Sequence, residues 1–174
     1  CVMKRYEALE TMLVQESPDV LVVDNRFAQR YKAEYEAAER GIHVYADKPI
    51  AVDELELKKL YQCVKENNVI LWAMDTVRYD PWYYTAWKLI QEGEIGKIRM
   101  VNFQKAYRLG KRLDFYRERK YYGGTIPWVT IHGIDMVRMV TGKEFLSVYA
   151  QQSTAENRGY GEMESITTSC FQME

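Results

Sequence analysis

The sequence predicts an α/β protein: a doubly wound parallel sheet, followed by an α+β domain with an antiparallel sheet. In the first half, short apolar runs alternate with helical patterns, and this alternation is typical of parallel βαβ units. In the second half, apolar and polar residues alternate in longer runs, which is typical of antiparallel strands with one covered face. We expect one domain over 1–77 and a second over 78–174.

The first elements follow from periodicity and from turn residues. Apolar residues at helical spacing predict a helix over 2–16, which Ser17-Pro18-Asp19 ends. The continuous apolar run 20–23 predicts a strand that is covered on both faces. A helix over 28–40 follows, with Gly41 directly after its end.

Two more strands and a helix complete the first half. Residues 43–46 predict a strand, Asp53 is the expected N-cap of a helix through 55–64, and 69–73 predict another strand. Right-handed crossovers make such strands parallel, and open parallel sheets bind ligands beyond the carboxyl ends of their strands. The residues at that edge are Asp24-Asn25, Asp47-Lys48-Pro49 and Met74-Asp75-Thr76.

The second half mixes helices with alternating patterns. In order, we expect a helix over 82–92, a strand over 98–104, a helix over 129–140 that ends at Gly142, and strands over 145–151 and 163–173.

Composition excludes several classes of function. Lys and Arg number 24 against 25 Asp and Glu, so charge gives no global attraction to nucleic acid or to a membrane surface. No apolar run has the length of a membrane span. Two histidines and three unclustered cysteines argue against a metal site and a disulfide framework, so we expect a reducing, cytoplasmic location.

A basic segment over 105–120 interleaves Lys and Arg with aromatic residues. Such a pattern can bind single-stranded nucleic acid, but Asp114 and Glu118 dilute its charge. A solvated loop or the rim of a site for an anionic substrate is the favoured interpretation.

Lys48 and His132 are the candidate catalytic residues. A lysine at a strand end can donate hydrogen bonds to a substrate oxygen, although it can also be an exposed loop residue; Pro49 fixes the turn and can supply a cis bond. His132 lies in a largely apolar helix, where it could act as a general base. The residues alone favour a core histidine, satisfied by a backbone carbonyl or by Asp135.

Several motifs in register resemble those of the Gfo/Idh/MocA family of nicotinamide-dependent oxidoreductases. Gly41-Ile42-His43-Val44-Tyr45-Ala46-Asp47-Lys48-Pro49 resembles the family's G-K-H-V-x-x-E-K-P signature. Pro18 to Val23 resembles the family's strand before the nicotinamide site, and Arg78-Tyr79-Asp80-Pro81 resembles its R-F-D-P turn. Gly93 to Ile98 resembles the segment that crosses into the second domain. Gly123-Gly124, followed by His132, resembles the family's active-site segment.

The resemblance implies part of a Rossmann-type, doubly wound parallel sheet, followed by part of an α+β domain with an open, mainly antiparallel sheet. It also implies hydride transfer between NAD or NADP and a sugar- or inositol-like alcohol. Lys48 would bond the substrate hydroxyl and His132 would take its proton. The residues implied at the cofactor are Asp24, Asn25, Asp47, Lys48, Pro49 and Thr76, and those at the substrate are Lys48, Arg78, Trp128 and His132. The family also implies a homo-oligomer formed through the second-domain sheet.

The sequence departs from the family pattern in four places. Trp128 stands where the family has a carboxylate, so Asp135 could orient His132 instead and Trp128 could stack on a sugar face. Thr76 replaces the usual Asn, and Asp24-Asn25 replaces Thr-Pro. We expect the first strand, the GxGxxG turn and the acidic ribose-binding residue to precede Cys1, and part of the second sheet to follow Glu174.

These departures leave two alternative functions open. One is NAD-dependent glycoside hydrolysis on the same scaffold. The other is a non-catalytic, dehydrogenase-like binding or oligomerisation module.

Overall fold

A computed structural model describes residues 3–174, which divide into two compact units on either side of the Met74–Asp75 bond. Each unit has a sheet of its own. Cys1 and Val2, the latter predicted to begin the first helix, lie outside the described residues.

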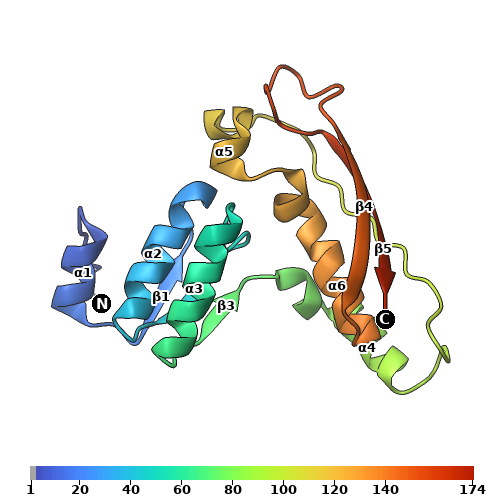
Figure 1. The fold of residues 1–174 in the computed structure, drawn as a ribbon, viewed down its shortest axis with the longest axis horizontal. Coiled ribbons are helices and arrows are strands. Elements are labelled where there is room, and N and C mark those ends of the chain that lie inside the picture. The colour runs from blue at the N-terminus through green and yellow to red at the C-terminus, as the bar shows by residue number, and fades with distance from the viewer. Residues whose placement is uncertain (1–2) are drawn as a thin grey trace. The chain divides into compact units, whose positions relative to one another are not determined.

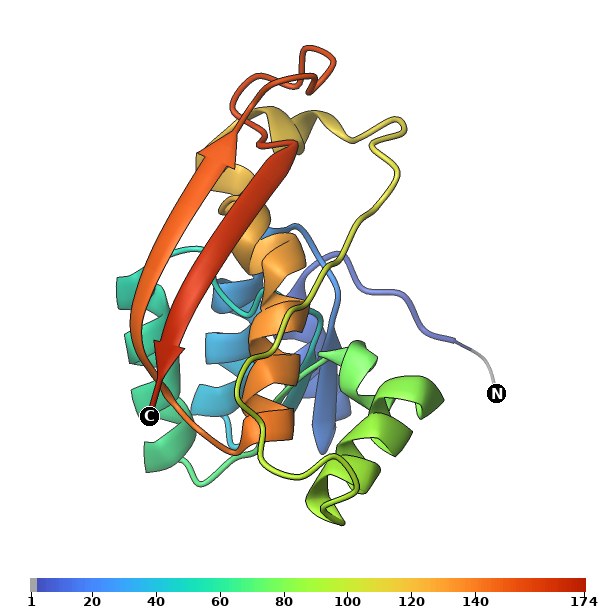
Figure 2. The same ribbon diagram turned by 90° about the vertical axis from the view of Figure 1, so that its right-hand side faces the viewer.

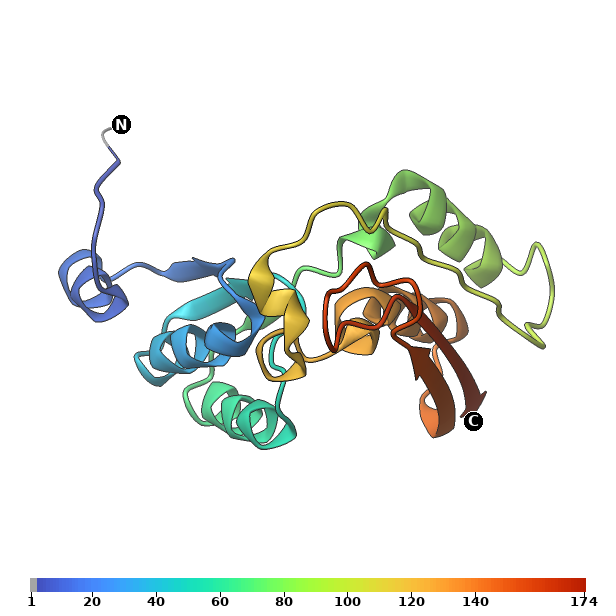
Figure 3. The same ribbon diagram turned by 90° about the horizontal axis from the view of Figure 1, so that it is seen from above.

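The first unit is built on a three-stranded parallel sheet in the order β1-β2-β3. Its helices α2 and α3 connect the strands and lie on the same face of the sheet, packed against each other (Figures 1 and 3). The elements are α1 (Leu9–Glu16), β1 (Val20–Val23), α2 (Phe27–Glu39), β2 (His43–Ala46), α3 (Glu54–Glu66) and β3 (Leu71–Ala73).

The core of this unit lies between the sheet and these helices. It gathers alternate residues of β1 and β2 with residues of α1, of α2 and of the turn before β2, namely Leu21, Val23, Val44, Ala46, Leu13, Ala37 and Ile42. On the other face, Val20, Val22 and Trp72 are 49%, 62% and 49% exposed. The prediction that β1 is covered on both faces is therefore wrong for the described chain, because α2 and α3 cover one face only.

Helix ends follow local chemistry. Asp53 caps α3 as predicted, since its Oδ1 accepts from the amides of Leu55 and Glu56 at 2.9 and 3.0 Å. The first helix begins at Leu9, later than predicted, and Ala8 at its N-cap offers no side-chain acceptor for the free amides. Before it, the Lys4 and Tyr6 side chains bond the Glu16 carboxylate instead.

The second unit combines short helices with a two-stranded antiparallel hairpin. Figure 2 shows the hairpin, β4 and β5, as a long ribbon beside α6. The elements are η1 (Thr76–Tyr79), α4 (Pro81–Gln91), η2 (Asp114–Arg117), α5 (Arg119–Tyr122), the π-helical turn η3 (Ile126–Thr130), α6 (Ile131–Thr141), β4 (Phe145–Ser153) and β5 (Ile166–Met173).

The strand predicted over 98–104 is wrong. Residues 97–113 have no regular structure, and β4 and β5 pair only with each other within the described residues. Alternating side chains favour extended backbone, but a strand also needs a neighbour to take its hydrogen bonds. This segment instead runs beside α6 (Figure 2). The Phe103 ring lies so close to Gly133 that a Cβ at position 133 would sit 2.6 Å from Phe103 Cδ1.

Disulfide bonds and membrane-spanning helices are two features that the sequence did not predict. Cys63 is buried and Cys170 is exposed, and both are free thiols. No helix among residues 3–174 is long and apolar enough to cross a membrane.

Candidate active site

The carboxyl ends of β1 and β2 meet at one edge of the first unit. The amide of Asp47 donates to the carbonyl of Val23 at 2.9 Å, so the residues that follow the two strands lie beside each other. This edge holds the predicted cofactor residues Asp24, Asn25, Asp47, Lys48 and Pro49. The carboxylates remain accessible, with the Asp24 side chain 76% and the Asp47 side chain 32% exposed.

Arg30 lies at the centre of this edge, and the sequence-based reasoning missed it. It belongs to the first turns of α2 and is 1% exposed. Its guanidinium pairs with the carboxylate of Asp47 at 2.8 Å and lies 3.5 Å from that of Asp24. The Lys48–Pro49 bond is cis, as the sequence suggested.

His132 is a buried titratable group in the second unit. It lies in the first turn of α6 and is 3% exposed. The carboxylate of Asp75 lies near it, with Oδ1 3.7 Å from Nδ1. That distance is too long for a direct hydrogen bond, but at such a buried place an anion stabilises the protonated imidazole.

Asp135 has a different partner from the one the sequence suggested. Its two carboxylate oxygens bind Arg78 in a bidentate pair, with Arg78 Nε 2.8 Å from Oδ2 and Nη2 on Oδ1. These hydrogen bonds raise the pKa of Arg78 above its ordinary value. Both oxygens of Asp135 thus bind Arg78, and the Asp75 carboxylate lies with its Oδ1 3.7 Å from Nδ1 of His132.

Trp128, the predicted substrate residue, lies in η3 within an aromatic cluster. Its ring centroid is 4.8 Å from that of Tyr116 and 6.1 Å from that of Tyr107. The guanidinium of Arg112 lies 4.9 Å from the Trp128 ring centroid. The predicted cofactor residue Thr76 is exposed at the start of η1.

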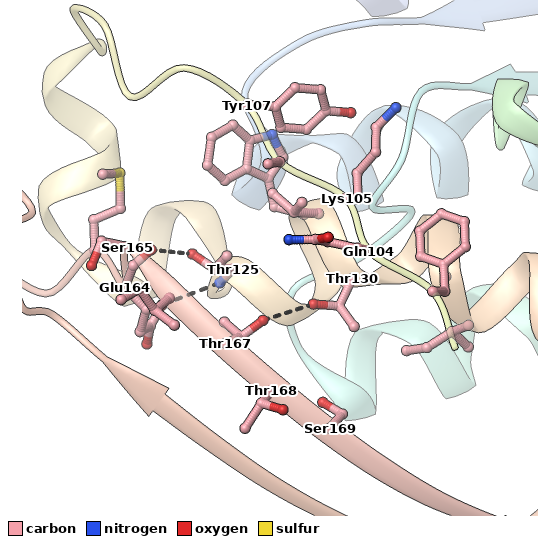
Figure 4. Close-up of a pocket in the computed structure, with 18 of the residues that line it drawn as sticks. Gln104, Lys105, Tyr107, Thr125, Thr130, Glu164, Ser165, Thr167, Thr168 and Ser169 are labelled. Atoms are coloured by element: carbon pink, nitrogen blue, oxygen red, sulfur yellow. Dashed lines mark hydrogen bonds between the residues drawn. The ribbon is translucent and has the colours of Figure 1, made fainter. Parts of the chain in front are cut away.

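A cavity of about 520 Å³ lies within the second unit, between the segment 97–113, α6 and β5. Figure 4 shows Gln104, Lys105 and Tyr107 on one wall and hydroxyl-bearing side chains such as Thr130 and Thr167 on another. The oxygens of Thr130 and Thr167 are 3.0 Å apart. Trp128 lines this cavity, whereas His132 is not among its lining residues.

Glu164 holds the turn that leads into the π-helical segment. It is 4% exposed, and its Oε2 accepts from the Thr125 amide at 3.1 Å (Figure 4). The same oxygen of Glu164 also accepts from the Tyr122 hydroxyl. Its other oxygen pairs with Arg119. Burial raises the pKa of the Tyr122 hydroxyl, so this group donates as the neutral phenol. Sequence reasoning missed Glu164, because its partners lie about forty residues away along the chain.

The donors and acceptors at the first unit's edge fit the nicotinamide half of a dinucleotide. Asp24 offers exposed carboxylate oxygens, and Lys48 adds a positive charge at the same edge. Pyrophosphate is normally held by a glycine-rich turn at a helix N-terminus. The three helices that the structure describes in this unit begin after Ala8, Arg26 and Asp53, and none of these turns is glycine-rich.

Both units match models of one protein family. Residues 1–74 match an oxidoreductase family with an NAD-binding Rossmann fold. Residues 83–174 match the GFO/IDH/MocA C-terminal domain.

Two of the curated relatives are named as dehydrogenases. The chain is 33% identical to levoglucosan dehydrogenase of Pseudarthrobacter phenanthrenivorans over 80% of this chain and 37% of that protein. It is 30% identical to scyllo-inositol 2-dehydrogenase (NAD(+)) of Bacillus subtilis over 76% of this chain and 39% of that protein.

The fold matches solved structures along the whole chain. A structure from Thermotoga maritima, named as an oxidoreductase, is 45% identical with a TM-score of 0.96, and the match covers 100% of this chain and 54% of that one. The chain thus spans about half of this structure and less than half of the curated relatives. Because the family's N-terminal and C-terminal models match the two units in order, the chain belongs to the GFO/IDH/MocA family of oxidoreductases.

Proposed function

We propose that the whole protein oxidises a secondary hydroxyl of a sugar- or inositol-like substrate with NAD or NADP, and that Lys48 and His132 act at that hydroxyl. The observation that carries this proposal is His132, a 3% exposed imidazole with a carboxylate 3.7 Å from Nδ1. The dehydrogenases named above support the substrate class.

His132 takes the hydroxyl proton in this proposal. The Asp75 carboxylate beside Nδ1 favours the tautomer that carries its proton on Nδ1. Nε2 is then the acceptor for the substrate proton, and the resulting imidazolium is stabilised by Asp75. Asp75 thereby fills the role for which the sequence offers no carboxylate at position 128.

Lys48 supplies a positive charge and hydrogen-bond donors to the same hydroxyl oxygen, which favours loss of its proton. Asp24, Asn25, Asp47, Pro49 and Thr76 are the residues proposed to hold the nicotinamide half of the cofactor. When bound, the cofactor accepts the hydride from the substrate carbon. Arg78 and Trp128 complete the proposed substrate contacts.

The test is a titration of NAD⁺ and NADP⁺ into the whole protein by calorimetry, followed by a panel of polyols and aldoses with reduced cofactor as the readout. We expect one cofactor to bind and one class of polyol to give stoichiometric reduced cofactor. His132→Ala should lower the rate by about 10²–10⁴-fold while the cofactor still binds.

Other results would select the alternatives. Cleavage of a glycoside with no net reduction of cofactor would identify a hydrolase that recycles its cofactor. No binding of either cofactor would overturn the oxidoreductase proposal and favour a binding module.

We further propose that the sheet of the second unit forms a contact between copies of the protein. The hairpin carries strongly exposed apolar side chains, with Tyr149 and Ile166 at 65% and 60% on one face and Val148 at 62% on the other. Exposed apolar groups on one sheet are typical of an interface. Light scattering should give an oligomer for the whole protein and a smaller species for Val148→Asp.

A further inference from the structure

Arg30 is a fully buried cation whose hydrogen bonds converge on one turn. Arg30 is 1% exposed, so its guanidinium is almost completely shielded from solvent. A buried charge of this kind is tolerated only where its donors are satisfied. The acceptors of Arg30 therefore indicate what the side chain holds in place.

Six oxygen atoms accept from this guanidinium. Four are backbone carbonyls: Asn25 after β1, and the consecutive residues Asp47, Lys48 and Pro49 after β2. The distances are 3.0 Å from Nε to Asn25, and 3.1 and 3.3 Å from Nη1 to Asp47 and Pro49. The other two acceptors are the carboxylates of Asp24 and Asp47.

The neighbouring groups leave the guanidinium little freedom. The ring of Phe27, one turn earlier in α2, lies under it with its centroid 4.6 Å from Cζ. The planar fork of arginine can bond acceptors in several directions at once, which the point charge of a lysine ammonium cannot reproduce. The side chain thus ties the start of α2 to the turns after two strands.

We infer that Arg30 is the positioning residue for Lys48. Since the carbonyl of Lys48 and those of both its neighbours are bonded to Nη1, the backbone of Lys48 cannot shift without breaking these bonds. Arg30 thereby fixes the point from which the Lys48 side chain extends. The role of this positioning in catalysis rests on the proposed function, whereas the ordering of 47–49 does not.

Arg30→Lys is the informative variant, because it keeps the positive charge but loses the planar guanidinium with its several hydrogen-bond donors. The matched control is Arg40→Lys at the other end of α2, where the arginine side chain is 32% exposed and pairs with Glu36 and Glu10. The first readout is hydrogen exchange of the segment 47–50. We expect exchange at least about tenfold faster in Arg30→Lys and unchanged in Arg40→Lys.

The second readout is steady-state kinetics of the whole protein. Misplacement of a reacting group lowers kcat with little effect on ground-state binding, so Arg30→Lys should lower kcat by about 10–100-fold and leave KM within a few-fold. A purely structural loss would instead lower the amount of folded enzyme and leave kcat per folded molecule unchanged.

Asp47→Asn keeps the proposal testable if Arg30→Lys does not fold. It retains Arg30 and its carbonyl bonds but weakens the ion pair, so exchange of 47–50 should rise by a smaller factor. Unchanged exchange of 47–50 in the folded variants would overturn the inference. If wild-type protein oxidises no polyol, the proposed function fails, and the exchange result still decides whether Arg30 orders the turn.

Discussion

Arg30 in the first unit and Arg78 in the second both meet aspartates, yet they hold different parts of the molecule. Arg30 donates mainly to backbone carbonyls and is 1% exposed. Arg78 donates to side chains, chiefly that of Asp135, and its own side chain is 34% exposed. A cation bonded to backbone fixes the course of the chain, whereas one bonded to a side chain fixes only that side chain.

The largest predicted difference in stability follows from this contrast. Arg30→Met should lower the free energy of unfolding by about 3–5 kcal/mol, because several buried carbonyls lose their donor at once. Arg78→Met should cost only about 1 kcal/mol, since its pair is partly open to solvent. Chemical denaturation of both variants measures the difference, and equal losses would contradict the contrast.

Glu34 should make the stability of the first unit depend on pH. It is fully buried one turn after Arg30, and its carboxylate has no hydrogen-bond partner among residues 3–174. Burial raises its pKa from 4.5 to about 8. The folded state therefore holds a proton that the unfolded state releases, and stability falls as the pH rises from about 5 to about 8.

Glu34→Gln removes this titration, so we expect a gain on the order of a few kcal/mol at pH 8 and little change at pH 5. Glu39→Gln, an exposed position on the same helix, is the control. Denaturation curves at several pH values test the prediction. An equal effect of Glu34→Gln at pH 5 and pH 8 would rule out the titration.

Packing of 97–113 against α6 can be tested in the second unit. Gly133→Ala places a Cβ 2.6 Å from Phe103 Cδ1, so we expect a loss of about 1 kcal/mol or more. In a Phe103→Ala background the same change should become stabilising by up to about 1 kcal/mol, because alanine favours the helix more than glycine does. Additive effects in this double-mutant cycle would show that the two residues do not touch.

The smallest expected effect is at the helix cap of α3. Asp53→Ala removes the acceptor for two amides and should cost about 1 kcal/mol. Asp53→Asn should retain most of the stability, because the amide oxygen can still accept. Thermal unfolding of the two variants tests this prediction. If both variants unfolded at the wild-type temperature, the cap would contribute nothing to stability.

Much of the first unit could be predicted because its signals are local. The apolar runs of β1 and β2, the Asp53 cap and Gly41 after α2 all act within a few residues. Arg30 also left a local signal, since it lies on the same helix face as the buried Phe27 and Ala37. A charged residue on a buried helix face requires partners, and the strand ends were the nearest candidates.

The second unit was harder to predict because its arrangement depends on distant partners. The pattern over 98–104 carries a strand's alternation, but it has no strand beside it within the described chain. The proximity of Asp75 to His132 joins η1 to α6, and no spacing in the sequence distinguishes it from the nearer Asp135. Such pairings depend on tertiary packing and have no sequence signature.

The most direct test of the account is single-turnover cofactor reduction by the whole protein with Lys48→Met, His132→Ala and the double variant. If both residues act on one hydroxyl, each single variant should lose about 10²–10⁴-fold in rate. The double variant should then be little worse than the poorer single one, because groups that act as a unit are not additive. Wild-type rates in both single variants, with the cofactor still bound, would contradict the assignment of the reaction to this pair.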